Sequence, residues 1–280
     1  MNAPAPRNKA GLVTGAAIGA AGALLGAAWL AGRRMDDARI TYPPLDIPKP
    51  VGEDLWIVDS GPIVAAGARL PVRMTVARLA DSGLWLHSPV QLTNALASAL
   101  AALGPVRHLV APTFAHWTFL GDWQAAFPEA TVWAAPNLRE RPQVRRAGLR
   151  VDADLGETAP PAWADRITQG VISGAGGFSE VWFFHRPSRT LILTDLIENL
   201  EPARLTPLTA LAMTAMGATR GKVAFHVRAA LAPRAVAVRA AVERMRALAP
   251  ERVILAHGRW FETNGTARLD RAFGWLLDAP

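Results

Sequence analysis

The chain has 280 residues, of which 51% are hydrophobic and 19% are charged, and this balance excludes both a disordered chain and a protein with many membrane spans. The net charge of +7 falls to +4 beyond the first 40 residues, where 25 basic and 21 acidic residues remain, so no nucleic-acid partner is expected. The absence of cysteine excludes disulfides, thiolate metal sites and cysteine nucleophiles.

An uncharged, apolar segment at residues 11–32 follows a short tail, residues 1–10. A helix of about 20 residues, rising ~1.5 Å per residue, spans the ~30 Å hydrocarbon core of a bilayer, whereas cleaved signal peptides have shorter apolar runs. We therefore predict an uncleaved, single-pass transmembrane anchor in contact with membrane lipid. Gly11, Gly15 and Gly19 place small residues on one side of this helix, a pattern that suits pairing with a second copy or with another membrane helix. Basic residues flank both ends, so the sequence does not predict the orientation.

Four prolines between residues 41 and 52 predict an extended segment, and we place a linker at residues 33–50 and a folded domain at residues 51–280. Apolar runs bounded by turn residues predict strands at residues 54–59, 74–79, 84–86, 106–111, 131–135, 167–172, 181–185, 190–194 and 252–256. Helical patterns occur at residues 91–103, 117–127, 138–147, 202–216, 233–248 and 266–277. Strand pairs with intervening helices, arranged in two halves, predict an α/β fold with two sheets packed between helices.

Four polar residues come at or soon after the ends of predicted strands. They are His87, His116, Asp195 and His257, in LWLHSP, VAPTFAHW, LILTDL and VILAHG. In open α/β folds, functional sites gather beyond the carboxyl ends of strands, and histidine and carboxylate are ligands for Zn, Fe and Mn. The pattern predicts a catalytic or metal-binding cluster of these four residues. The structural alternatives are that Asp195 caps the next segment and that His257 is a hydrogen-bonded residue at a buried strand end.

The motifs LWIVD, GLWLHSP, LILTDL and VILAHG, in this order, resemble the metallo-β-lactamase superfamily, and more narrowly its DUF4336 branch, over about residues 45–278. The resemblance implies an αββα sandwich and one or two metals that activate water for hydrolysis. Members combine an H-x-H-x-D-H loop, a histidine in a Gly-rich turn, a strand-end Asp and a final His before Gly. Asp195 and His257 match the last two, but the turn SGAGGFSE has Ala175 or Gly176 in place of its histidine.

The loop PTFAHWTFLGDW keeps one histidine of the family motif, His116, which aligns in two ways. Matching Gly121 to the family glycine makes His116 the second histidine of the motif, on the first metal. Matching the distance from the preceding strand makes it the last histidine, on the second metal with Asp195 and His257. The second alignment gives three protein ligands, the minimum for a catalytic zinc with an open position. His87 stands where many relatives have an Asp.

Two functions follow from this partial match. Loss of most of the loop motif favours a membrane-anchored, non-catalytic binding domain with a largely lost metal site and an unknown ligand. The alternative is a divergent hydrolase of an ester-type or similar small substrate, with one divalent ion (Zn, Fe or Mn) on His116, Asp195 and His257 and with His87 or Glu262 in proton transfer.

A third interpretation needs no metal. Ser88, directly after His87, or Thr113 would act as a hydroxyl nucleophile, although the G-x-S-x-G motif that often positions such a serine is missing. In any of the enzymatic interpretations, Arg259 is placed by the sequence to meet an anionic substrate. The sequence does not identify the substrate.

Overall fold

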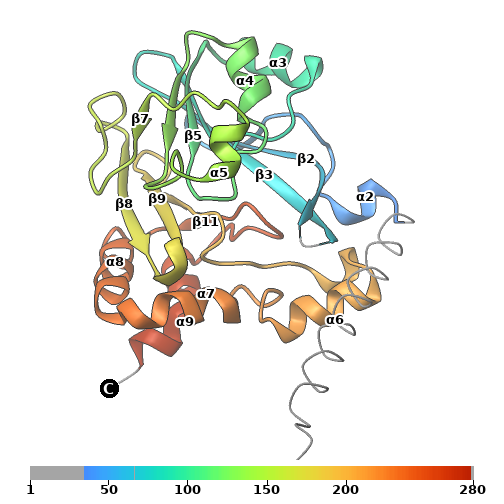
Figure 1. Ribbon diagram of the computed structural model, residues 1–280, viewed down its shortest axis with the longest axis vertical. Helices are drawn as coiled ribbons and strands as arrows, with labels where there is room; N and C mark the ends of the chain where they lie inside the picture. Colours follow the sequence, from blue (N-terminus) through green and yellow to red (C-terminus); the bar gives the residue numbers. More distant parts are fainter. Residues whose placement is uncertain (1–34, 66, 279–280) are drawn as a thin grey trace, which may run out of the picture.

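The computed structural model describes residues 35–65 and 67–278, which form two β-sheets packed face to face between two layers of helices (Figure 1). One sheet has the strand order β1-β2-β3-β4-β5-β6-β7 and the other has the order β11-β10-β9-β8. This αββα layering confirms the predicted sandwich. The strands are β1 (Lys49–Gly52), β2 (Leu55–Ala65), β3 (Ala68–Arg78), β4 (Leu84–His87), β5 (Val106–Ala111), β6 (Thr131–Ala134), β7 (Ala153–Asp154), β8 (Ile167–Ser173), β9 (Ser179–His185), β10 (Thr190–Ile192) and β11 (Arg252–Ile254).

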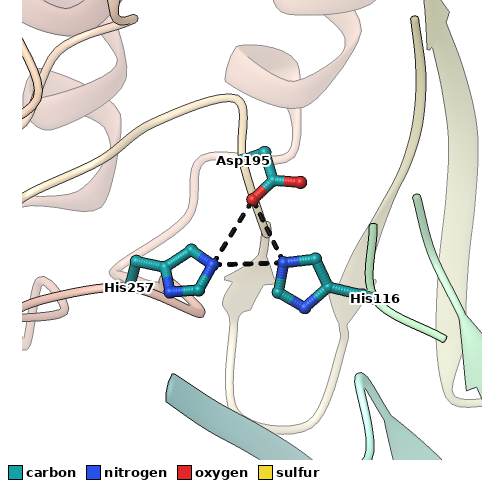
Figure 2. A group of neighbouring side chains, drawn as sticks. All are labelled: His116, Asp195 and His257. Carbon is teal, nitrogen blue, oxygen red and sulfur yellow. Dashed lines mark hydrogen bonds and ion pairs between the residues drawn. The ribbon is translucent and has the colours of Figure 1, made fainter. Parts of the chain in front are cut away.

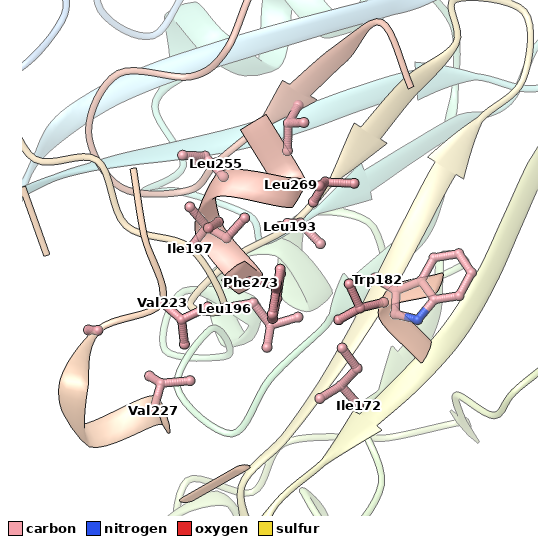
Figure 3. Close-up of a cluster of buried hydrophobic side chains, with 14 of the residues drawn as sticks. Ile172, Trp182, Leu193, Leu196, Ile197, Val223, Val227, Leu255, Leu269 and Phe273 are labelled. Atoms are coloured by element: carbon pink, nitrogen blue, oxygen red, sulfur yellow. The ribbon is translucent and has the colours of Figure 1, made fainter. Parts of the chain in front are cut away.

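Helices cover the outer face of each sheet. A buried cluster that includes Leu96 and Trp123 joins the first sheet to its helices, and a second cluster, drawn in Figure 3, joins the other sheet to the C-terminal helices through Val227 and Phe273. The helices are α2 (Asp37–Ile40), α3 (Asn94–Ala101), α4 (Leu120–Ala126), α5 (Pro142–Arg146), α6 (Pro207–Ala215), α7 (Phe225–Leu231), α8 (Ala235–Ala247) and α9 (Gly265–Leu277), with short 3-10 turns η1 (Ala175–Gly177), η2 (Pro202–Arg204) and η3 (Ala232–Arg234).

A third buried cluster, rich in aromatic residues, fills the space between the two sheets. Trp85 of β4 packs edge-on against Phe183 of β9, with ring centroids 4.9 Å apart, and against Trp163 at 6.1 Å. All three side chains are fully buried. Such rings bury large apolar areas in defined orientations, so they hold the strand ends that carry the predicted site at fixed positions.

The longest hairpin of the fold, β2 with β3, is only partly predicted by the sequence. The predicted strands at residues 54–59 and 74–79 are its base, and the structure continues both strands to the tip. Ser60, Gly61 and Pro62 interrupt the apolar pattern. Because proline also cannot donate a ladder hydrogen bond, the sequence predicts that the strand ends before these residues. The sheet accommodates them by a change of register between Ser60 and Ile63.

The proline-rich segment before residue 51 differs from the extended linker that we predicted. It contains α2 and the first half of β1, and it lies on the domain because its apolar and aromatic side chains have partners there. Ile40 is buried, and the Tyr42 hydroxyl donates a hydrogen bond of 2.7 Å to Glu201.

The transmembrane anchor predicted at residues 11–32 lies outside the described residues. Within residues 35–65 and 67–278, no helix combines the length and the apolar character that crossing a bilayer requires. The anchor therefore stays a prediction from the sequence.

Candidate metal centre

Three of the four predicted site residues meet at one point (Figure 2). His116 Nε2 lies 3.1 Å from Asp195 Oδ1 and 3.2 Å from His257 Nε2, and His257 Nε2 lies 3.5 Å from Asp195 Oδ1. Ligand atoms of a tetrahedral ion with bonds of ~2.0–2.1 Å are ~3.3 Å apart, so these atoms have the spacing of three corners of one such site. The second alignment of His116 requires this juxtaposition, whereas the first alignment requires the ligands to be divided between two sites.

Strand ends of both sheets position these three residues. Asp195 follows β10 and His257 follows β11, and these two strands are parallel neighbours that pair Ile192 with Ile254. His116 lies in the loop between β5 and α4, which belongs to the other sheet. The centre therefore lies at the edge of the sandwich where the carboxyl ends of strands from both sheets meet.

Hydrogen bonds determine which ring nitrogen of each histidine faces the centre. His257 Nδ1 lies 2.8 Å from the carbonyl oxygen of Pro71, which can only accept, so Nδ1 carries a proton and Nε2 presents its lone pair when the ring is neutral. His116 Nδ1 lies 2.5 Å from Ser88 Oγ, which leaves Nε2 for the centre. Two imidazole lone pairs and a carboxylate oxygen at these distances repel one another unless a cation or a proton lies among them. The donor set therefore fits a Zn, Fe or Mn ion.

Asp195 and His257 shift each other's pKa in opposite directions. Burial would raise the pKa of Asp195, but His116 and His257 hold it well below the ordinary value, so the carboxylate is ionised. Burial would lower the pKa of His257, but the Asp195 carboxylate outweighs burial and raises it. A proton on His257 therefore competes with a metal ion for the same centre.

The second oxygen and the backbone of Asp195 are also held in place. Asp195 Oδ2 accepts a hydrogen bond of 3.2 Å from Thr113 Oγ1. Glu180, which is fully buried, accepts the backbone N–H groups of Thr194, Asp195 and Leu196 at 2.7, 2.8 and 2.8 Å. Burial and the nearby Asp195 charge raise the pKa of Glu180 to about 8, although the N–H groups favour its ionised form.

Sequence reasoning missed Glu180, although a signal was present. A single acidic residue precedes the apolar run VWFFH, and a carboxylate in a buried strand needs dedicated hydrogen-bond donors. The backbone that carries Asp195 supplies those donors. Glu180 is therefore a positioning residue for Asp195.

A buried ion pair, also missed by sequence reasoning, holds the loop that carries His257. Arg73 Nη1 donates to the carbonyl oxygens of Leu255 at 2.7 Å and of Gly258 at 2.8 Å, one on each side of His257. Arg73 Nη2 lies 2.7 Å from Asp59 Oδ1. Charged residues within the apolar strand patterns LWIVD and RMTVAR were the signal for this pair. Partners of this kind orient metal ligands and are needed for tight binding.

The fourth predicted residue, His87, does not join the cluster. It ends β4, but its ring stacks on Trp85 and meets Phe183 edge-on, with centroids 5.4 Å away in both cases, and the residue is 1% exposed. Burial lowers the pKa of His87 to about 3, so the ring is neutral near pH 7. This position in the core does not suit the proton transfer that the sequence suggested.

The other residues considered from the sequence lie in three places. Ser88 and Thr113 are buried and contact the two ligands His116 and Asp195. Arg259 and Glu262 line a cavity of about 330 Å³ whose lining includes none of the three ligands. Gly176 lies in η1 with φ of 65°. The Gly-rich turn contains no histidine, so it brings no imidazole to the centre.

The sequence matches a known protein family. Residues 53–234 match the family described as "Domain of unknown function (DUF4336)". No curated protein matches the sequence.

Several solved structures have the same fold. A metallo-β-lactamase from Pontibacter korlensis is 13% identical with a TM-score of 0.54, over 83% of this chain and 99% of that one. The metallo-β-lactamase FIM-1 from Pseudomonas aeruginosa, in a mono-zinc form, is 13% identical with a TM-score of 0.55, over 85% and 99%. A metal-soaked flavodiiron core of Flv1 from Synechocystis is 11% identical with a TM-score of 0.57, over 82% and 60%. The chain therefore belongs to the DUF4336 family and has the fold of the metallo-β-lactamases.

Proposed function

We propose that the protein is a hydrolase that depends on a single divalent metal ion held by His116, Asp195 and His257. The observation that carries this proposal is the convergence of three ligand atoms at 3.1, 3.2 and 3.5 Å from one another. Three protein ligands leave a fourth position of a tetrahedral ion for water or substrate, as in catalytic zinc sites. The mono-zinc form of FIM-1 is a precedent for one zinc ion in a protein of this fold.

When bound, such an ion lowers the pKa of a bound water toward ~7 and polarises a carbonyl or phosphoryl oxygen. The chain's own residues supply the orientation. Thr113 and Glu180 hold Asp195, and the 18% exposure of the Asp195 side chain is the largest among the three ligands. Water and a small ester-type substrate would therefore approach from the Asp195 side of the centre.

The sequence favoured a non-catalytic binding domain because most of the loop motif is missing. Hydrolysis is better supported because each remaining ligand keeps a partner for its other polar atom: Ser88 for His116, Thr113 for Asp195, and the Pro71 carbonyl for His257. Such partners orient metal ligands and raise metal affinity.

One further observation favours metal-free catalysis as a second candidate. Ser88 Oγ, His116 and Asp195 form a continuous chain through contacts of 2.5 and 3.1 Å, which resembles the order of a Ser-His-Asp triad. Ser88 is 2% exposed, however, so its hydroxyl is poorly placed to attack a substrate. We therefore rank this candidate below the metal-dependent hydrolase.

Elemental mass spectrometry of the full chain, purified without chelators, tests the proposal. We expect about one Zn, Fe or Mn per folded chain, a loss of that metal in His257→Ala, and retention in His226→Ala, a matched control at an exposed position on α7. Hydrolysis of a chromogenic ester should stop with a chelator and return with zinc. A folded, metal-free wild-type chain that zinc does not activate would refute the proposal and favour the binding domain. Chelator-resistant hydrolysis that Ser88→Ala abolishes would favour the second candidate.

A further inference from the structure

A long segment at one side of the molecule combines exposed apolar residues with basic residues and has no acidic ones. Residues 202–242 contain six Lys or Arg residues and neither Asp nor Glu. Six large hydrophobic residues are strongly exposed in the described part of the chain, and four of them lie in this segment: Leu211 at 68%, Met216 at 37%, Phe225 at 73% and Val236 at 87%. Exposed apolar side chains grouped in this way mark an interaction surface.

Helices α6 and α7 bring three of these apolar residues into one region. The N–H group of Phe225, at the start of α7, donates to the carbonyl oxygen of Met216, which caps α6, at 2.8 Å. Leu211 lies on the exposed side of α6. The connection between the helices carries Arg220, which is exposed, and Lys222, which is half-buried. We call these five residues the α6–α7 surface.

The α6–α7 surface lies close to the point where the described chain begins. Arg39 Nε donates to the carbonyl oxygen of Ala203 at 3.4 Å, and Arg204 Nη1 donates to the carbonyl oxygen of Arg39 at 3.3 Å. Arg204 is three residues before the first residue of α6, and Figure 1 shows α2 and α6 on the same side of the molecule. The uncharged segment at residues 11–32 is therefore connected to the domain beside this surface.

We propose that the α6–α7 surface rests on an anionic phospholipid bilayer. Leu211, Met216 and Phe225 would enter the boundary between headgroups and acyl chains, while Arg220 and Lys222 pair with lipid phosphates. A second copy of the chain fits less well, because a two-fold interface would bring this segment, which has no acidic residues, against its own copy. This inference goes beyond the proposed hydrolase, since it assigns the domain an orientation on a membrane.

Environment-sensitive probes can test this contact because the chain has no cysteine. The full chain would be reconstituted with phosphatidylcholine vesicles, with and without phosphatidylglycerol, after labelling of L211C or F225C with a polarity-sensitive fluorophore. A125C is the matched control, since Ala125 is exposed and lies on α4, at the opposite end of the molecule from α6 (Figure 1). We expect a blue shift and quenching by spin-labelled lipid at positions 211 and 225 with the anionic vesicles, and neither at position 125.

The basic residues should contribute measurably to this contact. In the double variant R220Q and K222Q, we expect the equilibrium between lipid-bound and water-exposed label to shift on the order of 30-fold toward water. Labels at 211 and 225 that behave like the label at 125 would overturn the proposal, whether or not the chain floats with the vesicles. A blue shift that depends on protein concentration and is not quenched by spin-labelled lipid would also overturn it, in favour of a protein partner.

Discussion

The substitution Glu180→Gln isolates the contribution of one buried carboxylate to the candidate metal centre. In the structure, Oε1 of Glu180 accepts the N–H group of Thr194, and Oε2 accepts those of Asp195 and Leu196. Glutamine has the same size, but one of its two terminal atoms is an NH2 group that donates and cannot accept. At least one of the three backbone N–H groups therefore loses its partner in a fully buried environment.

The loss of stability can be estimated from the one N–H group that Glu180→Gln leaves without an acceptor. A buried polar group without a partner costs ~1–3 kcal/mol. We therefore expect the free energy of unfolding to fall by about 1–3 kcal/mol. Because the pKa of Glu180 is already raised to about 8, the loss comes from the missing acceptor more than from the missing charge. Displacement of the Asp195 backbone should also weaken zinc binding by about 10–100-fold.

Two measurements check this prediction. Urea unfolding of the full chain with excess chelator gives the change in stability, and competition with a chromophoric chelator gives the zinc Kd. Glu157→Gln is the matched control, because the Glu157 side chain is 60% exposed and its pairing with Arg244 is worth less than about 1 kcal/mol. If Glu180→Gln unfolds like the control and binds zinc like the wild type, Glu180 does not position Asp195.

Gly258→Ala should lower the free energy of unfolding by at least about 2 kcal/mol. Gly258 has φ of 79°, and an added Cβ would lie 2.1 Å from the carbonyl oxygen of Asn199. An unchanged urea midpoint would contradict this prediction. Ser88→Ala should weaken zinc binding by about 10–100-fold, since His116 Nδ1 loses its partner, and an unaltered Kd would show that the imidazole is oriented without the hydroxyl. His87 has a folded-state pKa of about 3, against an ordinary value of 6.5. Below about pH 6.5 the unfolded chain therefore takes up a proton that the native chain does not. The free energy of unfolding should fall as the pH is lowered, until about pH 3. Replacement by Phe should reduce this slope by up to about 1.4 kcal/mol per pH unit, and equal slopes in urea titrations of both proteins at about pH 6 and pH 4.5 would refute the assignment.

Local patterns determined most of the secondary structure. β5 is predicted residue for residue, because the short, β-branched segment VRHLVA lies between the turn Gly104-Pro105 and Pro112. β1, β7 and α7 are not predicted. β1 contains a proline at the sheet edge, β7 has only two residues, and α7 lacks a polar cap side chain, so each depends on its neighbours for stability.

The sequence also placed Asp195 and His257 at strand ends, and the resemblance to a known family implied that they lie together. Tertiary structure decided which other residues join them. His87 and Ser88 are adjacent at the end of β4, but the His87 ring packs between the sheets while Ser88, with φ of 56°, contacts His116. Successive side chains of a strand point to opposite faces, so the register of the strand decides which neighbour reaches the centre.

The contacts that hold the centre join residues far apart in the chain. The His116 to His257 contact spans 141 residues, and the Arg73 to Gly258 hydrogen bond spans 185. By itself, the sequence determined the elements and the chemical types available at their ends, because those depend on local periodicity and on burial of apolar runs. The combination of His116, Asp195 and His257 into one donor set, and its support by Glu180 and Arg73, were decided only by tertiary structure, because they depend on how two sheets pack against each other.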